Sequence, residues 1–221
     1  MKDQTKFIAV SNPIQVKLKK FIQIIEPIYL TLNKSVRFKY TVGNENLVPL
    51  ANSFTLAALI GVLLIIRITE VRSKKQTMLR GILMALVGQA VIAVGVYTKI
   101  LWFLFGGVLI NSIGNGIIIG LVSIMIADTI RYGASMGIQA EGVLASTDDF
   151  GVNVGLGVGG LITAGLFHFS GYVANRTQNA ATLTMIDLNY VWIPLVIYVG
   201  MYFVLRLYDE GRIERAIEAR K

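Results

Sequence analysis

The sequence predicts an all-α integral membrane protein, and three observations lead to this fold class. Hydrophobic residues make up 54% of the 221 residues, while charged residues make up 15%. Soluble domains are about half apolar and about a quarter charged, and the mean hydropathy of this chain is +0.64. The apolar residues gather in long runs, and the positive charges gather in short segments between those runs. This distribution is typical of a multi-pass protein of the cell membrane.

Five apolar runs have the length and composition of membrane-spanning helices, which need about 20 mostly apolar residues. The predicted spans are residues 47–66, 81–97, 101–127, 143–172 and 190–207. The fourth run differs from the others because polar residues and glycines interrupt it. We expect all five spans to belong to one transmembrane domain that covers residues 21–207.

Positive charge predicts the orientation of these spans. Segment Arg67–Arg80 holds five basic residues and one acid, and the tail 208–221 holds four basic residues. Short segments rich in Lys and Arg stay in the cytoplasm, whereas acids count for little. Both segments, and with them the C-terminus, are therefore predicted to be cytoplasmic. Alternation places the polar stretch 127–142 on the same side.

The basic N-terminal region predicts a sixth crossing. Five spans with a cytoplasmic C-terminus would leave residues 1–46 outside, although they carry seven lysines and Arg37. A short or degraded span within residues 21–43 removes most of this conflict and keeps residues 1–20 as a polar cytoplasmic segment. Its apolar part, Phe21–Leu32, would be only about 18 Å long.

Several function classes are excluded by composition. The chain has no cysteine, which excludes disulfides and thiolate metal sites. Its single histidine leaves little basis for a histidine-based metal or catalytic site. The basic residues that give the net charge of +8 lie between apolar runs. These basic clusters lack the interleaved aromatic residues of a surface that binds nucleic acid. Gly155, Gly157 and Gly160 fit G-x-G-x-x-G, but no strand precedes them. We therefore expect no enzyme and no nucleic-acid partner.

The stretch ADTIRYGASMGIQAEG, residues 127–142, carries the most specific pattern. With the apolar helix after it, this stretch resembles the signature before the eleventh span of glycoside-pentoside-hexuronide:cation symporters, a branch of the major facilitator superfamily. The family pattern is roughly A-D-T-V-D-Y-G, a short loop, then G-I-R-A-E-G. RFKYTVGN (37–44) and ITEVRSKKQTMLRG (68–81) resemble two further parts of that fold. The resemblance covers about residues 21–207 and implies the second six-helix half of a major facilitator fold, with five clear spans and one degraded span.

The resemblance implies a cytoplasmic gate in this stretch. Asp128 and Glu141 match acidic positions that, in the family, pair with basic residues of the first half. Tyr132 matches as well. Arg131 stands where the family usually has an acid, and Gln139 stands where it usually has an arginine. Two residues of the predicted gate therefore differ in charge from the family pattern.

Polar side chains inside two predicted spans are candidate cavity-lining substrate contacts. Asp149 and Asn153 share one helical stripe of the fourth span, and Asn153 stands where the family usually has a lysine. A carboxylate in a membrane normally faces a cavity or a partner, although Asp149 could also be hydrated near the interface. Asn111 and Asn115 share a face of the third span. They either contact sugar hydroxyls or form an interhelical hydrogen bond.

The implied function is symport of a glycoside, pentoside or hexuronide with Na⁺ or H⁺ by alternating access within the lipid bilayer. No cofactor beyond the coupling cation is expected. Three hypotheses follow because the resemblance covers one half only. The chain is a partial transporter that works with a separate N-terminal half or as a homo-oligomer, a non-transporting membrane fragment, or a repurposed membrane interaction subunit.

Overall fold

The computed structural model describes residues 46–69, 73–135, 141–174 and 176–206, and every regular element in these ranges is helical. The elements are α3 (Leu47–Ser53), η2 (Phe54–Ala57), α4 (Ala58–Thr69), α5 (Lys74–Thr98), α6 (Leu101–Ser135), α7 (Glu141–Ser170), α8 (Ala180–Asp187), η3 (Leu188–Trp192) and α9 (Ile193–Arg206). The segment 1–20, the proposed crossing within 21–43 and the tail 208–221 lie outside the described residues. The all-helical fold class is confirmed for the described part.

Four helical stretches in this part are long and apolar enough to cross a membrane. They are Leu47–Thr69, Lys74–Thr98, Leu101–Ala127 and Ala180–Arg206, and they contain the predicted first, second, third and fifth spans. The predicted fourth span lies in α7, a continuous helix of 30 residues that is about 45 Å long. Helix α7 is not one of the four. The number of spans in the whole chain stays a prediction.

The helices extend beyond the predicted spans at several ends. Helix α5 begins at Lys74, where the side chain of Ser73 accepts a hydrogen bond from the backbone N–H of Gln76 at 3.3 Å. Helix α6 continues through the start of the signature stretch to Ser135, so its 35 residues span about 52 Å. The physical reason is that hydropathy marks the part of a helix that lies in hydrocarbon, whereas polar residues can extend the same helix into water.

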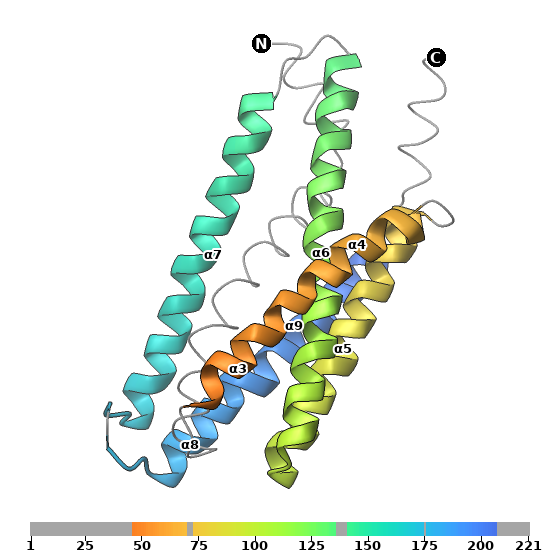
Figure 1. Ribbon diagram of the computed structural model, residues 1–221. Helices are drawn as coiled ribbons and strands as arrows, with labels where there is room; N and C mark the ends of the chain where they lie inside the picture. The colour runs from red at the N-terminus through yellow and green to blue at the C-terminus, as the bar shows by residue number, and fades with distance from the viewer. Residues whose placement is uncertain (1–45, 70–72, 136–140, 175, 207–221) are drawn as a thin grey trace.

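Helix α6 packs against α5 and against α4, which crosses it in Figure 1, and glycines allow the close approach. A Cβ atom on Gly114 would lie 2.5 Å from the backbone nitrogen of Ala85, and one on Gly107 would lie 2.6 Å from that of Ile92. On the other side, Gly116 of α6 faces the backbone of α4 in the same way. Packing through small residues is the usual way in which helices associate in lipid.

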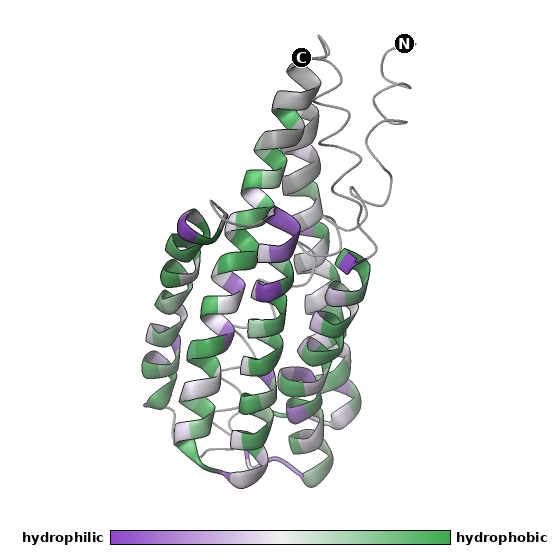
Figure 2. Cartoon of the chain, turned by 90° about the vertical axis from the view of Figure 1, so that its right-hand side faces the viewer, coloured by the Kyte–Doolittle hydropathy of each residue, from purple (hydrophilic) through white to green (hydrophobic). Residues whose placement is uncertain are grey.

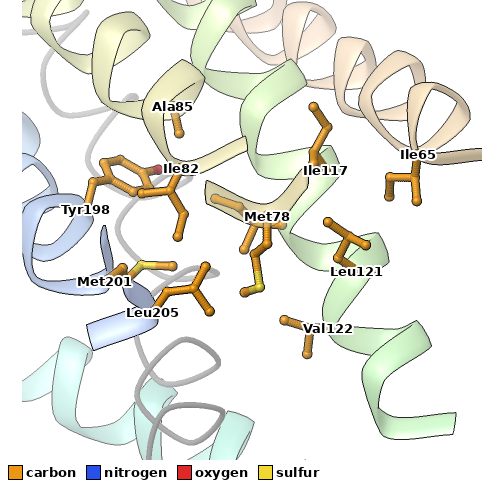
Figure 3. Packing of buried hydrophobic residues seen from close by; sticks show 11 residues of the cluster. Ile65, Met78, Ile82, Ala85, Ile117, Leu121, Val122, Tyr198, Met201 and Leu205 are labelled. Atoms are coloured by element: carbon orange, nitrogen blue, oxygen red, sulfur yellow. The ribbon is translucent and has the colours of Figure 1, made fainter. Parts of the chain in front are cut away.

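The largest apolar cluster lies where α4, α5, α6 and α9 meet, and Figure 3 shows how its side chains converge. Its buried members are Ile65, Met78, Ile82, Ala85, Ile117, Ile118, Leu121, Val122, Tyr198, Met201 and Leu205. Hydrophobic residues occur along all the helices (Figure 2), and many large apolar side chains are exposed, among them Leu56 at 67% and Leu63 at 65%. Soluble monomers rarely expose such surfaces, so this exterior fits contact with lipid.

The described helix ends next to the segments predicted to share one side of the membrane lie at one end of the bundle. Helices α4, α6 and α9 end there, and α5 and α7 begin there (Figure 1). Across this end, the Lys75 ammonium donates a hydrogen bond to the backbone oxygen of Arg206 at 3.2 Å. A cation at the carboxyl end of a helix is favourable because it complements the helix dipole. The grouping is therefore present, while the compartment that this end faces stays a prediction.

Candidate functional site

A buried cluster of polar side chains joins three helices near the middle of α6. Asn111 and Asn115 are only 2% and 4% exposed. Asn111 donates from Nδ2 to the backbone oxygen of Ala85 in α5 at 2.8 Å, and the same atom lies 3.5 Å from Oη of Tyr198 in α9. Tyr198 donates to Oδ1 of Asn115 at 3.0 Å, and Asn115 donates to Oδ1 of Asn111 at 3.2 Å. We call Asn111, Asn115 and Tyr198 the amide–phenol triad.

The contacts with Ala85 and Tyr198 are the interhelical hydrogen bonds that the sequence offered as one of two interpretations, while the bond between Asn115 and Asn111 lies within α6. Each group needs a partner because an amide in an apolar environment is costly to leave unpaired. The sequence did not identify Tyr198, since nothing in a tyrosine within an apolar run shows which helix its hydroxyl will meet. Whether Asn111 or Asn115 also contacts a sugar stays a prediction.

A second polar contact connects α5 with the helix turn η3. Gln89 is 2% exposed, and its Nε2 donates to the backbone oxygens of Tyr190 at 2.9 Å and Val191 at 3.1 Å. The sequence analysis did not single out Gln89. A lone amide within the run MALVGQAVIAV was the signal that could have identified it, because such a group needs a hydrogen-bond partner.

Helix α7 is connected to the α8–η3 segment by two buried hydrogen bonds. Thr182 donates from Oγ1 to the backbone oxygen of Ser170 at 2.8 Å, and Asn189 donates from Nδ2 to Oγ1 of Thr163 at 3.3 Å. Neighbouring helices thus fix both the end and the last turns of α7.

Helix α7 has two different faces along its middle. Three glycines at four-residue spacing are buried, namely Gly151, Gly155 and Gly159. The predicted stripe lies on another face, where Asn153 and Gly157 are exposed. A Cβ atom on Gly157 or Gly160 would meet open space. The side chain of Asp149 lies outside the described residues, so its contact with Asn153 or with substrate stays a prediction.

The predicted gate residues fall at the ends of α6 and α7. Asp128, Arg131 and Tyr132 belong to the last turns of α6, where spacings of three and four residues put them on one side of the helix. Glu141 is the first residue of α7, and Gln139 lies outside the described residues. The structure does not describe the side chains of the four helical residues, so their role as a gate stays a prediction.

Comparison with known proteins decides the family. Residues 37–211 match the family model described as MFS/sugar transport protein. The chain belongs to this family. It is a multi-pass membrane protein of a transporter family.

Three curated relatives narrow the assignment within the MFS/sugar transport family. The isoprimeverose transporter of Lactiplantibacillus pentosus is 33% identical over 178 residues, which are 80% of this chain and 37% of that protein. The putative glycoside/cation symporter YagG of Escherichia coli (strain K12) is 30% identical over 95 residues, or 41% of this chain and 21% of that protein. A glucuronide carrier protein homolog from the same strain is 33% identical over 86 residues, or 38% and 19%.

These relatives confirm the glycoside-pentoside-hexuronide:cation symporter family indicated by the signature stretch. The chain spans little more than a third of the length of the first of them and less of the other two. The family assignment therefore applies to the part of a symporter that this chain spans.

Proposed function

We propose that this chain forms part of a transporter that carries a sugar across the cell membrane together with Na⁺ or H⁺. The family and the names of the three relatives support a sugar as substrate. The name of one relative, a putative glycoside/cation symporter, supports coupling to a cation. Alternating access about a site near the middle of the membrane is the mechanism that such transporters use.

The exposed stripe of α7 that contains Asn153 is the observation that carries this proposal. Asn153 and Gly157 are exposed on a continuous helix of membrane-spanning length. If the hydrocarbon begins near Val143, Asp149 lies about 9 Å deep and Asn153 about 15 Å deep, which is near the midplane. In the proposed site, Asp149 accepts hydrogen bonds from sugar hydroxyls and Asn153 both donates and accepts them.

The remaining candidate residues receive supporting roles in this proposal. Asn111 and Asn115 hold α5, α6 and α9 together and shape the wall of the pathway. Asp128, Tyr132 and Glu141 close the cytoplasmic end against basic residues of a complementary half. Arg131 and Gln139 weaken that closure, because they differ in charge from the residues usual at these positions.

Uptake by membrane vesicles tests the proposal. Vesicles would contain the chain together with the first six-span half of a related symporter, and the probes would be labelled isoprimeverose and a labelled glucuronide. Asp149→Ala and Asn153→Ala should each lower the initial rate of uptake about tenfold, the effect of losing about 1.4 kcal/mol of binding. Ser123→Ala is the matched control, because Ser123 is exposed and bonds only to its own helix through the oxygen of Ile119.

The outcomes separate the site from the function. Uptake that persists unchanged in both α7 variants would reject the α7 site while leaving transport intact. Absence of any uptake by correctly inserted protein, with or without the complementary half, would reject the transport proposal. Ionophores that collapse either the Na⁺ or the H⁺ gradient then identify the coupling ion.

A further inference from the structure

The last helical stretch contains a turn that departs from the α-helix. Within η3, the backbone N–H of Ile193 bonds to the oxygen of Leu188, five residues earlier, as in a π-helix. Pro194 follows, and proline has no backbone N–H. In an α-helix that N–H would pair with the oxygen of Tyr190, four residues earlier. The oxygen of Tyr190 therefore has no α-helical donor.

Gln89 supplies a donor at this position. Its Nε2 reaches the oxygens of Tyr190 and Val191 at 2.9 and 3.1 Å. Irregular backbone at membrane depth persists only where protein groups satisfy it. A side chain from the neighbouring helix thus donates to the backbone beside the π turn, including the Tyr190 oxygen that Pro194 leaves without its α-helical donor.

The π turn widens the buried surface of the last helical stretch. Positions 182 and 186 are buried in α8, the three consecutive positions 189, 190 and 191 are buried in η3, and positions 194, 198, 201 and 205 are buried in α9. A π turn contains one residue more than an α-helical turn, so it rotates the side chains that follow it relative to those that precede it. Helix α8 contacts α7, whereas α9 contacts α5 and, through Tyr198, α6.

We infer that Gln89 is a positioning residue whose hydrogen bonds to η3 set the register at which Tyr198 meets Asn111 and Asn115. The amide–phenol triad depends on this register, because Tyr198 lies four residues beyond Pro194. The consequence for transport rests on the proposed function, whereas the consequence for helix register does not.

Tryptophan fluorescence of the detergent-solubilised chain tests the register directly. The chain has two tryptophans, so Trp102→Phe leaves Trp192 as the sole reporter in η3. Trp192 donates from Nε1 to Oη of Tyr97 at 3.0 Å, and Tyr97→Phe provides the emission expected when this contact is lost. Gln89→Met keeps the volume of the side chain but removes its donor. Its emission should move toward that of the Tyr97→Phe variant.

The matched control for this substitution is Gln76→Met. Gln76 lies on the same helix and is exposed, so its replacement should leave the emission unchanged. An emission of the Gln89→Met variant equal to that of the parent would overturn the inference.

A second variant keeps the test decisive if Gln89→Met does not fold. Gln89→Glu retains the shape, and its carboxyl can donate a hydrogen bond only when protonated. At acidic pH its emission should lie near that of the parent. An emission far from the parent at every pH would show that the donor is not what sets the register, and would overturn the inference.

Uptake in the reconstituted transporter provides the functional measurement. Gln89→Met should lower the initial rate about five- to tenfold, as expected for the loss of two hydrogen bonds inside a membrane protein. In a Tyr198→Phe background the same substitution should have little further effect, because both act through one cluster. Fully multiplicative losses would overturn the positioning role. Absence of uptake by the parent would contradict the proposed transport function, while Trp192 emission would still decide the role of Gln89.

Discussion

The close approach of α5 and α6 predicts a large difference between two identical substitutions on one helix. Gly114→Ala would place a Cβ atom 2.5 Å from the backbone nitrogen of Ala85 and 2.8 Å from the oxygen of Gly81. Both neighbours are backbone atoms, so no side-chain rotation relieves the overlap. Gly106→Ala adds the same methyl group where nothing lies within 4 Å.

The geometry gives the magnitude. Ordinary contact begins near 3.4 Å, so the two helices must separate by about 0.9 Å around Gly114. The hydrogen bond from Asn111 to the oxygen of Ala85, now 2.8 Å, would lengthen beyond a useful distance. Overpacking costs about 1–3 kcal/mol, and an interhelical hydrogen bond in a membrane is worth about 0.6 kcal/mol. Gly114→Ala should therefore be less stable than Gly106→Ala by about 2–3 kcal/mol.

Thermal unfolding in detergent, followed by circular dichroism, measures this difference. A domain of about this size loses roughly 2–4 °C of Tm per kcal/mol, so the two variants should differ by about 4–12 °C. The gain in helix propensity on replacing glycine with alanine is common to both variants and cancels in the comparison. Equal unfolding temperatures would refute the close packing described for α5 and α6.

Three further predictions follow from the contacts and the topology. Tyr198→Phe should lower the free energy of unfolding by about 1–3 kcal/mol, because the buried Oδ1 of Asn115 loses its donor. The control Tyr202→Phe should change that free energy little, and equal effects of the two substitutions in a denaturant titration would contradict the triad. The chain has no cysteine, so an impermeant thiol reagent should label Gln76→Cys from the cytoplasm and Thr177→Cys from outside; labelling of both from one side would contradict the topology. Gly157→Leu should leave the Tm unchanged yet slow uptake, and unimpaired uptake would remove this face of α7 from the pathway.

Hydropathy and charge identified much of the architecture. The runs that begin near residues 47, 81 and 101 are buried or lipid-facing helices in the structure, because any helix in hydrocarbon needs about 20 apolar residues whatever its neighbours. The basic segments predicted which helix ends lie together at one end of the bundle, because a cluster of Lys and Arg can likewise be recognised within a short stretch of sequence. The helix ends were predicted less well, since polar residues extend α6 into water without any signal in hydropathy.

The signature stretch 127–142 predicted the family, although it did not predict that its first half continues a helix. The four-residue spacing of Asn111 and Asn115 predicted that these amides share a helix face. It did not decide whether their partner is a sugar hydroxyl or a group on a neighbouring helix. Their contact with Tyr198 depends on a residue 83 positions later in the chain than Asn115, and a short window of sequence cannot contain such a contact.

The sequence by itself determined the class of protein, the apolar helices of the described part and the family, because composition, run length and a contiguous motif are local properties. The tertiary structure decided which polar groups meet. Gln89 reaches η3 only because α5 packs beside α9, and Tyr198 reaches the amide pair only because α9 packs against α5 and α6. Both depend on how separate helices pack, and the pattern within a single helix does not contain that information.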